Sequence, residues 1–249
     1  MVDLHSHVLP GLDDGASDLE QAVAMCRAAA ADGIEILAAT PHVRTDYSTT
    51  PEQMETGLVA LQAAAGDIVQ LVAGGEIALT ELERPLPELT RFGLGGNPRF
   101  LLVETPYVGW PLDLAERLFR LRVAGITPVL AHPERNADVQ LRPELLEPIV
   151  AGGTLVQLTA AAVDGRLGRR ARSCCEVLLD RRLAHLVASD AHEPSVRAIG
   201  MSSAARTLGA GELAAWLTDG MPRAIVGDAP LPPRPERPKR GGLFVRRGF

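Results

Sequence analysis

Two histidines stand two residues apart close to the start of the chain, in Asp3-Leu4-His5-Ser6-His7. On an extended strand, residues i and i+2 point to the same face, so His5 and His7 can both reach one point in space. This is how the end of a strand offers two imidazoles to a single metal ion. A turn that carries two carboxylates, Asp13-Asp14-Gly15, follows soon after. The alternative interpretation is two surface histidines near a terminus.

Further histidines and carboxylates stand where predicted strands end. Apolar, β-rich runs predict strands at residues 2–5, 34–39, 68–73, 100–103, 127–131, 154–158 and 185–188. Six of these strands end in or near candidate ligands, which are His5, His7, His42, Glu76, Glu104, His132, Asp190 and His192. The sixth strand, ending at Gln157, Leu158 and Thr159, has no obvious ligand. His185 begins its strand instead of ending it, so we expect it to be buried for structural reasons.

This set of side chains predicts a centre with more than one metal ion. Imidazole and carboxylate together suit first-row divalent metals such as manganese, iron or zinc. Five histidines and the carboxylates of Asp14, Glu76, Glu104 and Asp190 are enough for two or three ions with a bridging carboxylate. Such clusters generate hydroxide near neutral pH and stabilise an in-line displacement at phosphorus. Three divalent ions against four carboxylates would leave a positive site suited to a phosphate dianion.

Helices are predicted between the strands. Ser17-Asp18-Leu19-Glu20 is a capping box before an alanine-rich helix that ends near Gly33, and Thr50-Pro51-Glu52-Gln53 starts a second helix. Further helices are expected at 113–123, 143–150, 170–181, 195–208 and 211–218. Seven strand-then-helix units predict an α/β fold with a parallel sheet, and their even spacing favours a closed barrel. In such a barrel, chemistry gathers at the carboxyl ends of the strands, where the candidate ligands stand.

Composition narrows the class of protein. A chain of 249 residues that is 46% hydrophobic can bury a full core, as one barrel or two small domains. The net charge of −6 argues against nucleic acid as a partner. There is no apolar run near 18 residues, so no membrane span is predicted. The N-terminus lacks the pattern of a signal peptide, and three cysteines without zinc-finger spacing indicate a cytoplasmic protein with reduced thiols.

The last part of the chain has a different composition. Residues 227–249 are rich in proline, glycine and arginine, so we predict a domain over residues 1–226 and a tail over 227–249. Prolines at this spacing favour an extended, polyproline-like segment. The tail could be an inert solubilising extension or a basic segment that docks on an acidic partner.

Three further residues invite a functional interpretation that their surroundings oppose. The run from Cys175 to Arg181 matches the Cys-x5-Arg pattern of cysteine-dependent tyrosine phosphatases. That chemistry needs a thiolate of low pKa and a glycine-rich loop, whereas this run reads as an amphipathic helix. Arg44 and Arg166 could reach a substrate, but solvated surface positions are expected for both.

Taken in order, these motifs resemble a known superfamily. HxH near the start, then TPH, GGE, ETP, HPER and SDAH, is similar to the PHP (polymerase and histidinol phosphatase) superfamily. The Asp-Asp-Gly after HxH, with HPER and SDAH, resembles most the bacterial CpsB/YwqE-type tyrosine-protein phosphatases, which act with capsule and exopolysaccharide kinases. The resemblance spans nearly all of residues 1–226. It implies a distorted (β/α)7 barrel, related to the TIM barrel, with a trinuclear metal centre usually assigned to manganese.

The resemblance also implies roles for single residues. One metal would be held by His5, His7, Glu76 and Asp190. A second would be held by Glu76, Glu104 and His132, with Glu76 bridging, and a third by Asp14, His42 and His192. Arg135 and Arg197 match the phosphate-binding arginines of the family. Thr105-Pro106 and the stretch 158–162 depart from the family pattern and would line the mouth of the site.

The function expected from this pattern is metal-dependent hydrolysis of protein phosphotyrosine in the cytoplasm. The substrate would be the phosphotyrosine of a bacterial tyrosine kinase, in its tail. The leaving phenol has a pKa of about 10, so a strong general acid is not essential; His192 or a bound water could supply the proton. Two alternatives remain: a small-molecule phosphatase of the same superfamily, such as a histidinol-phosphate hydrolase, and a non-catalytic kinase-binding partner.

Overall fold

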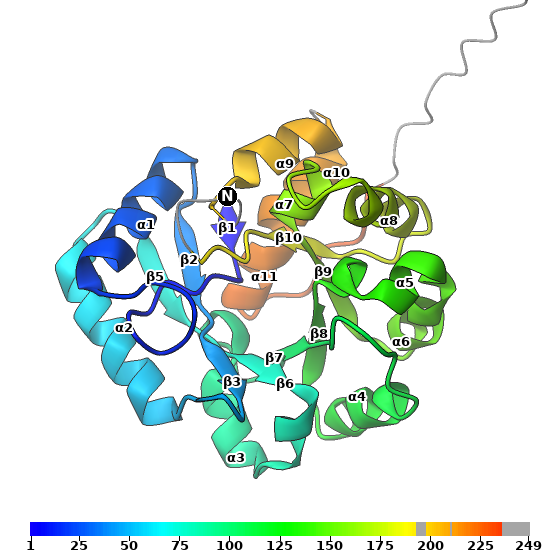
Figure 1. The fold of residues 1–249 in the computed structure, drawn as a ribbon, viewed down its shortest axis with the longest axis horizontal. Helices are drawn as coiled ribbons and strands as arrows, with labels where there is room; N and C mark the ends of the chain where they lie inside the picture. The colour runs from blue at the N-terminus through cyan, green and yellow to red at the C-terminus, as the bar shows by residue number, and fades with distance from the viewer. Residues whose placement is uncertain (193–197, 210, 236–249) are drawn as a thin grey trace, which may run out of the picture.

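The computed structural model describes residues 1–192, 198–209 and 211–235. It is a barrel of short parallel strands with helices around the outside (Figure 1). A three-stranded sheet has the order β1 (Val2–Asp3), β2 (Ile36–Ala39) and β5 (Gln70–Ala73). A seven-stranded sheet has the order β10-β9-β8-β7-β6-β3-β4, and these strands are β10 (Leu186–Ala188), β9 (Leu155–Thr159), β8 (Thr127–Ala131), β7 (Phe100–Glu104), β6 (Glu76–Ala78), β3 (His42–Arg44) and β4 (Tyr47–Ser48).

The two sheets join into one barrel because two strands of the first sheet continue, after a short break, as strands of the second sheet. After a break at Thr40 and Pro41, β2 continues as β3, and after a break at Gly74 and Gly75, β5 continues as β6. At the other edge, β1 meets β10 through a parallel bridge between Ser6 and Ala191. In the described part of the chain, the barrel therefore has seven strand positions, and every pairing there is parallel except β3 with β4. This confirms the predicted distorted (β/α)7 barrel.

The breaks explain the strands that the sequence pattern missed. All seven predicted strands are present within a few residues, but β3, β4 and β6 were not expected. His42 and Glu76 therefore begin short strands instead of following longer ones. The break in β5–β6 needs glycine, because a Cβ at Gly75 would lie 2.7 Å from the ring of Phe92. In the sequence alone, glycines at such a break indicate the end of a strand.

Most of the predicted helices are present. The helix predicted at 195–208 begins only at Met201, and its residues 195–197 lie outside the described part of the chain; short helices at 86–89, 137–141 and 160–163 were not expected. The α-helices are α1 (Leu19–Ala31), α2 (Pro51–Ala65), α3 (Leu86–Leu89), α4 (Leu114–Val123), α5 (Ala137–Leu141), α6 (Glu147–Ala151), α7 (Ala160–Val163), α8 (Arg169–Asp180), α9 (Met201–Leu208), α10 (Glu212–Ala215) and α11 (Met221–Val226). Thr50 and Gln53 form the predicted capping box of α2. The N-cap of α1 is Asp18, one residue later than predicted, and it accepts a hydrogen bond from the backbone N–H of Gln21.

Shorter helical turns complete the connections. The 3₁₀ turns are η1 (Leu79–Glu83), η2 (Thr90–Phe92), η3 (Leu94–Gly96), η4 (Pro133–Arg135) and η5 (Pro143–Leu146). The helix predicted at 143–150 is therefore a 3₁₀ turn followed by α6. The helix predicted at 211–218 extends further, since α10 passes through a π-helical turn, η6 (Trp216–Gly220), into α11.

The described start of the C-terminal segment lies against the barrel. The indole N–H of Trp216 donates to the carbonyl of Pro232 at 3.0 Å. The Arg234 guanidinium donates to the carbonyls of Leu179 and Ala184, and lies 5.5 Å from the centre of the Trp216 ring. Pro232 and Arg234 thus tie this segment to η6, to α8 and to the residues just before β10. The remaining residues, 236–249, lie outside the described part of the chain.

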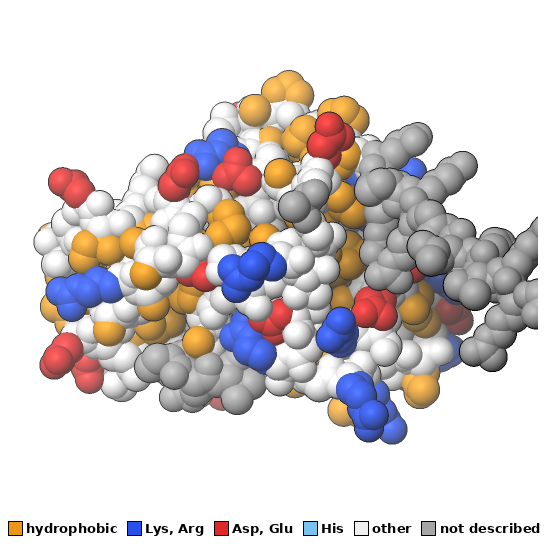
Figure 2. All heavy atoms as spheres, turned by 90° about the horizontal axis from the view of Figure 1, so that it is seen from above, with side chains coloured by type: hydrophobic (Ala, Val, Ile, Leu, Met, Phe, Trp, Pro, Cys, Tyr) orange, Lys and Arg blue, Asp and Glu red, His pale blue; other side chains and the backbone are white. Residues whose placement is uncertain are grey.

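Two surface properties bear on the class of partner. Charged side chains of both signs are interspersed on the face drawn in Figure 2, without a large basic patch. On this face, neither sign of charge forms an extended patch. Within the described residues, none of the helices has the length and apolar character needed to cross a membrane.

Candidate metal centre

All nine predicted ligand residues come together at the mouth of the barrel. Each lies in or just after a strand, or in the loop after β1, and the ligand atoms form four overlapping groups within 4.8 Å. The groups are His5 with His7 and Asp190; His5 with Glu76 and His132; His42 with Glu76 and Glu104; and His7 with Asp14, His42 and His192. Residues as far apart in the sequence as His5 and His192 thus share one site.

Glu76 is the centre of this cluster. Its Oε2 atom lies 3.4 Å from Nε2 of His5 and 3.4 Å from Nε2 of His7. The same oxygen lies 2.9 Å from Nδ1 of His42, and Oε1 lies 2.7 Å from Nε2 of His132. One carboxylate therefore contacts four imidazoles and belongs to two of the four ligand groups, as a ligand shared between two metal ions would.

Asp190 and Asp14 contact the cluster from two sides. Asp190 Oδ1 lies 3.6 Å from Nε2 of His5 and 3.5 Å from Nε2 of His7. Asp14 Oδ1 lies 3.4 Å from Nε2 of His42 and 3.3 Å from Nε2 of His192. Asp14, His42 and His192 thus lie in one group, which His7 joins, and His5, His7 and Asp190 lie in another, without Glu76. The third predicted set is divided, because Glu104 groups with His42, whereas His132 groups with His5.

The cluster has the properties of a site built for cations. His5, His7 and Glu76 are fully buried, and burying charged groups without compensation is costly. Glu76 Oε2 and His42 Nδ1, both buried, lie 2.9 Å apart without the alignment of a hydrogen bond. Burial and the negative charge of Glu76 raise the pKa of Glu104. Divalent ions would relieve all of these costs, so the residues fit the metals that the sequence pattern predicts.

Hydrogen bonds from outside the cluster set the orientation of its imidazoles. Asp13 Oδ2 lies 2.6 Å from Nδ1 of His7. Gln157 Oε1 lies 3.1 Å from Nδ1 of His5 and accepts from the backbone N–H of His132 at 3.2 Å. A His that donates its Nδ1–H in this way leaves Nε2 free to bind a metal. Gln157 was not predicted; the available signal was an amide side chain in an otherwise apolar strand.

Backbone conformation also directs ligands into the site. His132 has φ 33° and Asp190 has φ 52°, in the left-handed region that residues with a Cβ rarely adopt. His132 directly follows β8, and Asp190 follows β10 after one intervening residue, Ser189. The turn they make brings their side chains over the mouth of the barrel. Strained backbone of this kind is maintained where the surrounding structure requires it, often at functional sites.

Positive side chains lie at the edge of the cluster. The Arg135 guanidinium forms an ion pair with Asp190 Oδ2 and lies 4.7 Å from the centre of the Tyr107 ring. Arg44 Nη1 lies 3.5 Å from Glu104 Oε1. The expectation of a solvated surface position for Arg44 was therefore wrong, because the short strand β3 carries it to the mouth. The second predicted phosphate-binding arginine, Arg197, lies outside the described residues.

The remaining candidates lie apart from the cluster. Arg166 pairs with Asp164 and donates to the carbonyl of Ala198. Cys175 is buried in α8, and burial raises the pKa of its thiol well above the usual value. A thiol held protonated in a helix cannot serve as the nucleophile of a cysteine phosphatase. His185, expected to be buried for structural reasons, is half-buried away from the cluster, and its Nδ1 accepts from the backbone N–H of Val156.

The fold and the cluster together define a class of protein: barrel enzymes that carry a histidine–carboxylate metal centre at the carboxyl ends of parallel strands. Comparison with known proteins narrows the class. A family model described as "Capsular polysaccharide synthesis, CpsB/CapC" matches residues 1–211, and the chain belongs to this family.

Curated relatives and solved structures agree with this assignment. The chain is 33% identical over 202 residues to tyrosine-protein phosphatase YwqE of Bacillus subtilis, covering 79% of each chain. It is 31% identical over 198 residues to the putative tyrosine-protein phosphatase CapC of Staphylococcus aureus, covering 77% of each. A crystal structure from work on YwqE and CpsB of Streptococcus pneumoniae, described as unique metal-dependent tyrosine phosphatases, superposes with a TM-score of 0.86 at 29% identity. That superposition covers 96% of this chain and 100% of the other.

Proposed function

We propose that this protein is a metal-dependent protein-tyrosine phosphatase of capsule or exopolysaccharide synthesis, acting in the cytoplasm on a phosphorylated bacterial tyrosine kinase. The observation that carries the proposal is the nine-residue histidine–carboxylate cluster with Arg135 at its edge. Family membership and the metal-dependent tyrosine phosphatases among its relatives support the same reaction. Three buried thiols, Cys26, Cys174 and Cys175, are compatible with a reducing compartment.

The cluster is proposed to hold three divalent ions, with manganese favoured over iron or zinc. His5, His7, Glu76 and Asp190 would hold one ion, and Asp14, His42 and His192 another. Glu104 and His132 would complete the third site with Glu76. When bound, such ions stabilise negative charge on a phosphate and lower the pKa of a water molecule for attack at phosphorus.

Residues of the chain itself would bind and orient the phosphate. Arg135 presents a planar guanidinium, which suits bidentate contact with two phosphate oxygens. Its stacking on Tyr107 and its ion pair with Asp190 hold that guanidinium beside the cluster before the substrate arrives. Arg197 is proposed to act in the same way. Arg44 also lies at the mouth, next to Glu104, where it pairs with Asp46.

The sequence pattern suggests two roles for His192, as a metal ligand and as a proton donor. Its Nδ1 lies 3.0 Å from the carbonyl of Asp190, which suits an N–H donor, and its Nε2 faces Asp14 at 3.3 Å. With Nδ1 protonated, Nε2 offers a lone pair and no proton, so the ligand role is favoured. The leaving tyrosine has a pKa of about 10, and water can protonate it.

Turnover of matched substrates tests the proposal. Purified protein with added manganese is compared on a phosphotyrosine peptide and on histidinol phosphate. We expect hydrolysis of the peptide with a clear preference over histidinol phosphate, and loss of activity with a chelator. Preference for histidinol phosphate would assign the protein to small-molecule phosphatases. No turnover of either substrate, with metal bound, would assign it to non-catalytic kinase-binding partners.

A further inference from the structure

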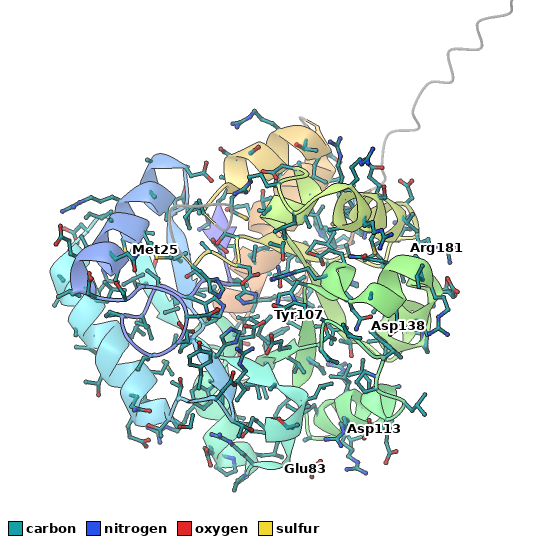
Figure 3. The ribbon with its side chains drawn as sticks, viewed as in Figure 1. Met25, Glu83, Tyr107, Asp113, Asp138 and Arg181 are labelled. Atoms are coloured by element: carbon teal, nitrogen blue, oxygen red, sulfur yellow. The ribbon has the colours of Figure 1, made fainter. Side chains whose placement is uncertain are left out.

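A groove runs outward from the metal cluster, between η1 and the segment that follows β7. Its inner end is formed by Glu104 and Arg44, and its outer end by Arg117 of α4. The groove has a volume of about 410 Å³, within the range of known ligand pockets. Figure 3 shows Tyr107 near the middle of the barrel mouth, with Asp113 and Glu83 near its rim on this side.

The groove is continuous with the metal cluster. Glu104 lines the groove and also groups with His42 and Glu76 in the cluster. Arg44 lies at the same junction, 3.5 Å from Glu104. A phosphate ester bound at the cluster can therefore extend its organic part into the groove without any rearrangement of the strands.

The middle of the groove is apolar, and its charges are paired. Leu79, Pro106, Tyr107 and Pro111 contribute apolar surface. At the outer end, the Arg117 guanidinium is 2.7 Å from a carboxylate oxygen of Asp113 and 3.4 Å from one of Glu83. At the inner end, Arg44 is 2.8 Å from Asp46. Charge neutralised in this way gives little attraction for a charged ligand, so the groove favours an uncharged, apolar one.

The surroundings of the groove suit a polypeptide better than a small molecule. Val108 is 80% exposed and Leu112 is 101% exposed, and both neighbour groove residues in the sequence. Large apolar side chains gathered at one place on a surface are typical of interaction sites. A small phosphate ester would leave them uncovered, whereas a polypeptide leaving the groove would contact them.

We propose that this groove binds the polypeptide segment that flanks the phosphotyrosine of a protein substrate and selects an apolar side chain close to it. This inference rests on the proposed phosphatase function and adds the substrate preference. The Thr105-Pro106 pair lines the groove and would contribute to the preference of this chain.

Matched phosphopeptides test the groove. Pairs of equal length carry either leucine or serine next to the phosphotyrosine, on its N-terminal or its C-terminal side, and p-nitrophenyl phosphate reports the chemistry alone. For one of the two sides, we expect kcat/KM to favour leucine by about tenfold, the scale of an apolar contact in a binding pocket. Thr80→Trp, at an exposed position in the groove, and Leu79→Glu should reduce that preference to near one.

Controls separate the possible outcomes. Leu141→Glu makes the same change as Leu79→Glu at an exposed position outside the groove and should keep the leucine preference. If Leu79→Glu fails to fold, Thr80→Trp decides the result. Equal kcat/KM for leucine and serine peptides in the unaltered protein, or a preference that survives Thr80→Trp, would overturn the inference. Absence of p-nitrophenyl phosphate turnover in the unaltered protein with manganese would overturn the phosphatase function itself, and the groove's role with it.

Discussion

Glu76 illustrates how much of the site depends on a single side chain. Burial alone would raise the pKa of this carboxyl, but the surrounding imidazoles, His5 and His132 foremost, hold it well below the usual value. A charged carboxylate is therefore stable at the bottom of the barrel mouth only because of its neighbours. Because these groups stabilise one another's charges, loss of one of them would change the pKa values of the rest.

Replacement of Arg135 tests phosphate binding. Removing one charged donor from a transition-state site typically costs on the order of 100-fold in rate. Arg135→Ala should lower kcat/KM for an aryl phosphate by that order, and Arg197→Ala should act in the same direction. Arg120→Ala, at an exposed arginine paired with Glu116, serves as the control. Unchanged kinetics for both Arg135→Ala and Arg197→Ala, with metal content intact, would exclude these arginines from phosphate binding.

Two substitutions distinguish metal chemistry from cysteine chemistry. His7→Ala removes a residue that contacts both Glu76 and Asp190, and even second-shell changes at metal sites cost about 10- to 100-fold. Cys175→Ser changes a thiol buried in α8. We expect His7→Ala to lose metal and activity and Cys175→Ser to keep near-native activity, as measured by elemental analysis and aryl phosphate turnover. An inactive Cys175→Ser protein with its metals still bound would contradict this mechanism.

At the scale of elements, the loop between β1 and α1 places Asp13 and Asp14 against the cluster. Its path depends on Gly15, where an added Cβ would lie 2.0 Å from the carbonyl oxygen of His7. The backbone N–H of Gly15 also donates to Asp13 at 2.9 Å. The loop can therefore pack on the end of β1 only if this position has no side chain.

Gly15→Ala should consequently disturb the site without removing any ligand. The methyl group would push the loop away from His7, so we expect weaker metal binding at Asp14 and reduced activity that excess manganese partly restores. Gly57→Ala, in α2, is the matched control, since a Cβ there would meet only ordinary van der Waals contacts, with the side chains of Leu9 and Leu12. Metal titration followed by activity measures both variants. Equal metal affinity in Gly15→Ala and the unaltered protein would show that the loop does not position Asp14.

At the scale of the whole molecule, the metal centre joins distant strands of the barrel. His5, Glu76, His132 and Asp190 come from β1, β6, β8 and β10 or the residues after them, so bound ions would cross-link the sheet. We expect two to three divalent ions per chain by elemental analysis, and a lower thermal unfolding midpoint after chelation. One ion or none after purification without chelator, with no rescue by manganese, would exclude a trinuclear centre.

The stability of the barrel should also depend on pH through His185. Burial, together with the positive charge of Arg234, lowers the pKa of His185 to about 4. The unfolded chain has the ordinary value of about 6.5 and binds more protons between these limits, so stability is lost as pH falls from 6.5 toward 4. The loss from this group is roughly 2 kcal/mol by pH 5. Urea unfolding at pH 7 and pH 5 should show a smaller loss in His185→Gln; equal losses would contradict this.

Much of the fold could be predicted because its signals are local. The alternation of apolar runs and capped helices depends on neighbours a few residues apart, as in the capping box of Thr50 and Gln53. The strands β3 and β6 could not be predicted, because each is a three-residue continuation after a break. Their strand character comes from pairing with each other and with β7, which no local pattern contains.

The sequence by itself determined which side chains form the candidate metal centre, because ligand types at strand ends in a parallel barrel must converge on one mouth. Tertiary structure alone decided how they are grouped: Glu76 between four imidazoles, Glu104 with His42, and Gln157 beneath His5. It also decided that Arg44 reaches the site and that a groove leads away from Glu104. The physical reason is that spacing along one strand is a local property. Distances between side chains on different strands depend on the breaks, the register and the closure of the whole barrel.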